Sequence, residues 1–64
     1  MSNQPASNNQ TYEIRLITAF GKNLRFATQA TNSQEAVEYA KGLMLRHECD
    51  SGEVWCGMQL IRRL

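Results

Sequence analysis

From Tyr12 to Leu16, large apolar residues alternate strictly with charged ones. A period of two residues is typical of a strand with one buried face, so such a strand is predicted from Tyr12 to about Ala19 or Phe20. Residues 21–23 provide a turn, since they combine glycine with small or polar neighbours. A second alternation, over residues 24–30, then predicts the return strand of a β-hairpin.

A helix is predicted after this hairpin. Asn32 is a good N-cap residue, and Glu35 lies three positions later, which is the spacing of a capping box. Apolar residues then recur at helical spacing, which predicts one face packed on the sheet. They are Ala36, Val37, Ala40, Leu43 and Met44, followed by His47. Glycine inside a helix costs about 1 kcal/mol relative to alanine, so we expect Gly42 to permit close approach of another element.

Residues 49–52 are expected to end the helix and turn the chain into a third strand. Its predicted inward residues are Val54, Cys56, Met58 and Leu60, and its outward residues are Trp55, Gly57, Gln59 and Ile61. The predicted fold is therefore a small α+β domain of order ββαβ, with a three-stranded, mainly antiparallel sheet and one helix on one face. We favour the strand order 2-1-3. The alternative places the third strand beside the second, as a parallel pair joined by a right-handed crossover.

A single helix leaves the other face of the sheet uncovered, and function is sought there. The residues predicted to bind a partner on this face are Glu13, Arg15, Ile17, Arg25, Glu53, Trp55, Ile61 and Arg63. Trp and Arg are enriched at binding hot spots, and Ile17, Trp55 and Ile61 would form an exposed apolar patch. The alternative is a shift of one residue in register, which would place Trp55 in the core.

The leading functional hypothesis is a small adaptor or inhibitor that binds another protein through this face or through a sheet edge. Alternatively, the same face could pair with a second copy of the chain in a symmetric homodimer. The alternative is single-stranded nucleic acid stacked on Trp55 beside the arginines. A formal charge of +1, together with Glu13 and Glu53, makes nucleic acid the weaker hypothesis.

Catalysis and metal binding are not expected. The chain has one histidine, no glycine-rich phosphate loop and no arrangement of a nucleophile with a base, so it is not predicted to be an enzyme or to carry a cofactor. His47, Cys49 and Cys56 are metal-ligand residue types. Their spacing, however, does not supply the four ligands of a structural zinc site.

The segment 1–10 has no charged side chain and is predicted to be a disordered polar tail, with residues 11–64 forming a single domain. It lacks the basic start and apolar run of a signal peptide, and no stretch is long enough for a membrane span. We therefore expect a cytoplasmic protein in which Cys49 and Cys56 are thiols.

The stretch from Ala30 to Lys41 resembles the strand-to-helix element of many small α+β proteins, some of them phage-encoded inhibitors of host enzymes. Because a cap followed by an amphipathic helix arises often, the resemblance identifies no family. It implies that a domain of this kind acts by occupying a surface on a larger protein.

Overall fold

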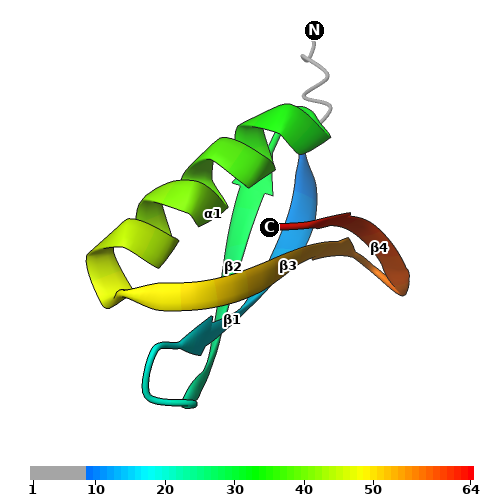
Figure 1. Cartoon of the computed structure of the whole chain (residues 1–64). Coiled ribbons are helices and arrows are strands. Elements are labelled where there is room, and N and C mark those ends of the chain that lie inside the picture. Colours follow the sequence, from blue (N-terminus) through cyan, green and yellow to red (C-terminus); the bar gives the residue numbers. More distant parts are fainter. Residues whose placement is uncertain (1–8) are drawn as a thin grey trace, which may run out of the picture.

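The computed structural model describes residues 9–64, which form four strands and one helix. In chain order the elements are β1 (Gln10–Thr18), β2 (Asn23–Ala30), α1 (Ser33–His47), β3 (Cys49–Cys56) and β4 (Gln59–Arg63). The strands form one antiparallel sheet in the order β2-β1-β3-β4, and α1 lies across one of its faces (Figure 1). The predicted pairing of the third strand with the first is confirmed. The prediction of three strands is wrong, since the sheet has four.

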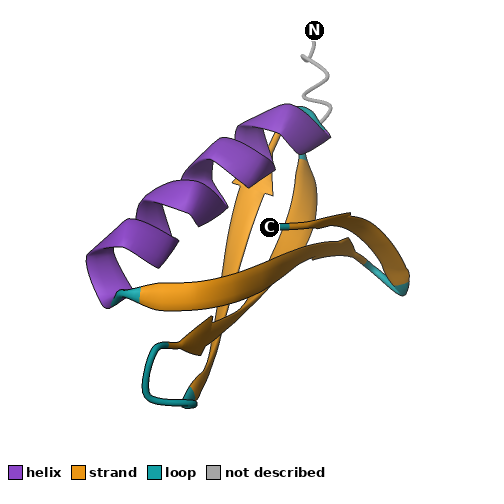
Figure 2. Ribbon diagram, in the orientation of Figure 1, coloured by secondary structure: helices purple, strands orange, loops and turns teal. Residues whose placement is uncertain are grey.

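The predicted third strand is broken by a two-residue turn (Figure 2). Cys56 pairs with Gln59, and the residues between them reverse the chain. Gly57 has φ 61°, whereas Met58 is not in the left-handed region. A glycine with positive φ at the first turn position matches a type II′ hairpin, so the chain leaves the strand here. Met58 was predicted to face the helix, but it is 98% exposed at the turn.

A bulge in β4 then changes which side chains face the helix. Trp55 pairs with Leu60 and Val54 pairs with Arg62, so Ile61 is the extra residue between the two pairs. Ile61 packs against the hydrophobic core, although it was predicted on the uncovered face. Leu60 lies opposite Trp55 instead. The predicted orientations of both residues are therefore wrong.

Two boundaries also differ from the prediction. Gln10, which was assigned to the tail, is the first residue of β1, and residues 1–8 of that tail lie outside the described residues. Residues 49–52 were predicted to be a turn but belong to β3. The helix ends at His47 because the next residue, Glu48, adopts the left-handed conformation with φ 54°. The Glu48 N–H donates to the carbonyl of Met44.

The core lies between α1 and the inward face of the sheet. Its buried apolar residues are Tyr12, Ile14, Leu16, Ala30, Ala36, Val37, Ala40, Leu43 and Val54. The predicted N-cap is confirmed, since Asn32 Oδ1 accepts a hydrogen bond of 2.9 Å from the N–H of Glu35. The Glu35 carboxylate reaches back to the N–H of Thr31 at 2.8 Å, one residue before the N-cap.

The close approach between helix and sheet occurs at Gly52 in β3, not at Gly42. A Cβ atom at Gly52 would lie 2.6 Å from Leu16 Cδ2 and 3.4 Å from Met44 Sδ. Nothing lies within 4 Å of the corresponding position at Gly42, so the expectation for that residue is wrong. The absence of a side chain therefore lets β3 fit between β1 and α1 at Gly52.

Candidate functional site

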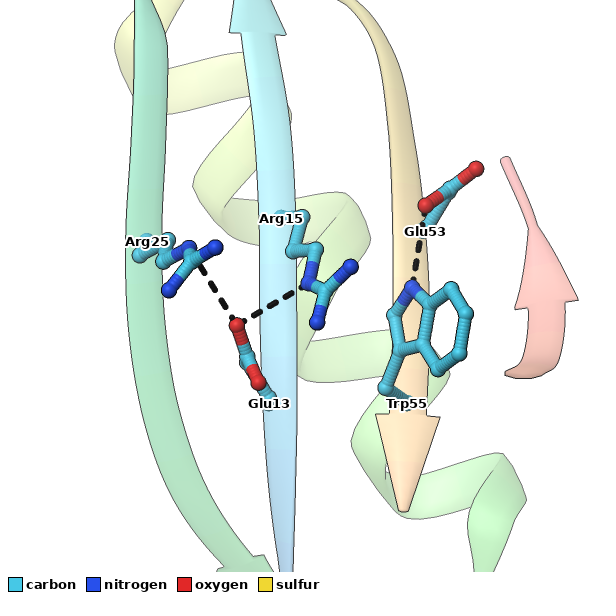
Figure 3. Close-up of polar contacts among 5 residues, drawn as sticks. All are labelled: Glu13, Arg15, Arg25, Glu53 and Trp55. Carbon is cyan, nitrogen blue, oxygen red and sulfur yellow. Dashed lines mark hydrogen bonds and ion pairs between the residues drawn. The ribbon is translucent and has the colours of Figure 1, made fainter. Parts of the chain in front are cut away.

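The sheet face opposite α1 carries side chains from all four strands, arranged in cross-strand rows. Directly opposed residues of an antiparallel pair lie on the same face, so the registers define the rows. One row is Arg25, Arg15, Glu53 and Arg63, and the next is Ala27, Glu13, Trp55 and Leu60. We call these residues together with Ile17 the open face. Figure 3 shows five of its side chains on one side of the sheet, with the helix behind.

Glu13 forms ion pairs with two arginines at the centre of the open face. Arg15 and Arg25 are directly opposed on β1 and β2, an arrangement in which like charges repel. Oε2 of Glu13 accepts from Nε of Arg15 at 2.9 Å and lies 3.3 Å from Nε of Arg25 (Figure 3). The hydrogen bond from Arg15 lowers the pKa of Glu13 below its ordinary value of 4.5; partial desolvation opposes this, and the charges of both arginines reinforce it.

Glu53 and Arg15 together hold the Trp55 indole. The indole N–H donates to Oε1 of Glu53 at 2.9 Å, and Oε2 of the same carboxylate lies 3.6 Å from Nε of Arg63. The guanidinium carbon of Arg15 lies 4.4 Å from the centroid of the Trp55 ring, which is a cation–π distance. Trp55 is half-buried on the open face and is not part of the core. It is therefore fixed by polar contacts rather than by packing under the helix.

The three arginines keep hydrogen-bond donors beyond those in their ion pairs. Each forms its ion pair through Nε, and within residues 9–64 no contact is assigned to the terminal nitrogens of Arg15, Arg25 or Arg63. The side chains of Arg25 and Arg63 are 73% and 76% exposed. A guanidinium has five N–H donors in a plane, so the open face presents preoriented donors to solvent.

A pocket of about 380 Å³ lies beside the row of charged residues. Its lining includes Arg15, Ile17, Asn23, Arg25, Ser51, Glu53, Arg63 and Leu64. Ile17 is 44% exposed, and its register partners are Asn23 and Ser51. The pocket thus combines an exposed apolar residue with guanidinium groups.

The structure brings together every predicted partner-binding residue except Ile61. Glu13, Arg15, Ile17, Arg25, Glu53, Trp55 and Arg63 lie on the open face. Ile61 lines a different pocket, together with Val37 and Lys41 of α1. Leu60 was missed as an open-face residue. Gly57 was the sequence signal that could have revealed the orientation of Leu60, because glycine inside an apparent strand often marks a turn or bulge.

The other candidate chemistry is not assembled. Within residues 9–64, no group of three or more His, Cys, Asp and Glu residues is placed to hold a metal ion. Cys49 and Cys56 are free, and His47 packs against Phe26 with their ring centroids 5.3 Å apart. Over the same residues, no helix combines the length and apolar character needed to cross a bilayer.

No protein-family model, curated protein or solved structure matches the chain. The open face is therefore interpreted from its own residues.

Proposed function

We propose that this chain is a small non-enzymatic protein-binding module, an adaptor or inhibitor, and that another protein docks on the open face. The observation that carries the proposal is the arrangement of Trp55, Arg15 and Glu53, in which the tryptophan is held at the surface by a hydrogen bond and a cation–π contact. Trp and Arg dominate the energetics of many protein interfaces. Side chains that are already ordered lose little conformational entropy on binding, which favours affinity.

The surroundings of Trp55 support a protein partner over single-stranded nucleic acid. Arg15 already lies over the indole ring, so a base that stacked there would have to displace the guanidinium. Glu13 and Glu53 would also repel phosphates close to the ring. Ile17 and Leu60 add apolar surface, which a protein partner is able to bury.

The experiment is site-specific photo-cross-linking of the full chain in the cells that produce it. p-Benzoylphenylalanine is placed at Ile17 on the open face and, as the control, at Leu45, which is exposed on α1. We expect a discrete protein adduct from position 17 that is absent from position 45. The Trp55→Ala substitution should remove the adduct while circular dichroism still shows a folded chain.

Three results would contradict the proposal. The first is equal adducts from both positions, and the second is an adduct that survives Trp55→Ala in a folded chain. The third is an adduct that disappears when nuclease is added before irradiation, which would favour nucleic acid. An adduct between two copies of the chain, supported by a doubled mass in light scattering, would instead identify the homodimer.

A further inference from the structure

We infer that the pocket beside Ile17 binds a carboxylate side chain of the protein partner, an Asp or Glu that is adjacent to an apolar residue. This inference rests on the proposed function and adds the chemistry of the group that the open face recognises. Its basis is the pocket lining, in which Arg15, Arg25 and Arg63 are combined with Ile17.

The charge of the lining favours an anion. Its ionised side chains are three arginines and one glutamate, Glu53, a formal balance of +2, which Glu13, paired with Arg15 and Arg25 beside the lining, reduces to +1. The Glu53 oxygens already face Trp55 Nε1 at 2.9 Å and Arg63 Nε at 3.6 Å. Glu53 therefore helps to orient Arg63, and the balance of charge around the pocket stays positive.

The shape of the donors favours a planar acceptor. Arg15, Arg25 and Arg63 use Nε for their ion pairs, so the terminal nitrogens are the donors that remain, as far as the described residues show. A guanidinium presents paired N–H groups in one plane, which match the two oxygens of a carboxylate. The opposed positions of Arg15 and Arg25 provide two such groups on neighbouring strands.

The apolar part of the lining favours an acidic residue of a protein over a free anion. Ile17 and Leu64 line the pocket, so an apolar residue beside the acidic one gains contact area. These features point to an acidic segment of a protein that is interrupted by apolar side chains.

The test is a titration of the isotope-labelled full chain, followed by NMR. The probe is a short end-blocked peptide with adjacent Asp and Glu between leucines, and the matched control replaces them by Asn and Gln. We expect the acidic peptide to shift the Ile17 methyl signals and the Nε–H signals of Arg25 and Arg63. Arg25→Gln and Arg63→Gln should each weaken binding by roughly two- to fivefold, as for an exposed ion pair. Arg46→Gln, on the exposed side of α1, should leave binding unchanged.

The inference is overturned if the amide peptide produces the same shifts as the acidic one, or if neither peptide shifts Ile17. It is also overturned if a thymidine oligonucleotide shifts the same signals at a lower concentration in the same salt. The cross-linking assay separates this inference from the proposed function. An Ile17 adduct that survives Arg25→Gln with Arg63→Gln but is lost in Trp55→Ala would retain the protein-binding module and reject the carboxylate pocket. Loss of specificity for position 17 would reject both.

Discussion

The guanidinium of Arg15 lies 4.4 Å from the centre of the Trp55 ring while its Nε donates to Glu13 at 2.9 Å. One side chain therefore joins the carboxylate of β1 to the indole of β3, and the position of Trp55 depends on both contacts. Lysine at this position would keep the charge but lose the planar group that lies on the ring.

We predict that Arg15→Lys destabilises the fold by about 1 kcal/mol, since an exposed cation–π contact and an exposed ion pair each contribute about that much or less. The tryptophan fluorescence of the native state should also change, because the cation over the indole is replaced. Urea unfolding measures the first effect and emission spectra the second. Arg25→Lys is the matched control, since Arg25 contacts Glu13 but has no assigned contact with Trp55. An identical response in the two variants would contradict the role given to Arg15.

Gly52→Ala is predicted to destabilise the chain by about 1 to 3 kcal/mol, the range for overpacking a filled site. The added methyl group would meet Leu16 at 2.6 Å and the backbone oxygen of Arg15 at 3.3 Å. Because Leu16 is fully buried, it has little room to move away. The urea midpoint should fall with little change in the slope of the transition. An unchanged midpoint would mean that β3 does not approach β1 this closely.

Gly42→Ala is predicted to have the opposite effect. The position lies inside α1 and nothing lies within 4 Å of an added Cβ, so alanine should stabilise the helix by about 1 kcal/mol. The two substitutions are chemically identical and differ only in their surroundings. Thermal unfolding of both variants against the parent chain should give shifts of opposite sign. A loss of stability in Gly42→Ala would contradict the open surroundings of this position.

The ion pairs of Glu13 predict a dependence of stability on pH. The folded-state pKa of Glu13 is lower than its ordinary value of 4.5, so the folded state binds the proton less tightly than the unfolded state does. The carboxylate thus stabilises the fold above about pH 4.5, and this contribution is lost as the pH falls through the lower folded pKa. The difference in unfolding free energy between the parent and Glu13→Gln should shrink over that interval. Glu38→Gln, exposed on α1, is the control.

Local patterns predicted much of the fold. The alternation at Tyr12, Ile14 and Leu16 identified the buried side of β1 because strand periodicity depends only on neighbouring residues. The capping pair Asn32 and Glu35 likewise located the start of α1 through contacts within one turn. Both signals are short-range, so they did not require knowledge of the partner strands.

The C-terminal hairpin was missed because the short-range pattern does not reveal it. A two-residue turn preserves an apparent period of two, so Cys56, Met58 and Leu60 seemed to continue a single strand across Gly57. The bulge at Ile61 then moved the later residues out of phase, and a bulge is defined only by pairing with β3. Trp55 precedes the turn and was predicted on the correct face. Ile61 follows it and was not.

The position of β1 in the sheet has a consequence for amide hydrogen exchange. β1 is bonded on both sides, by β2 and β3, whereas β4 is a five-residue edge strand bonded only to β3. Protection should therefore be highest around Ile14 of β1, which is opposite both Phe26 and Val54, and lowest along β4. Arg15 and Glu13 then belong to the slowly opening part of the sheet, while Leu60 and Arg63 belong to the part that opens first. If the proposed interface is correct, its β1 residues would form a fixed template, and its β4 residues would adjust to a bound protein.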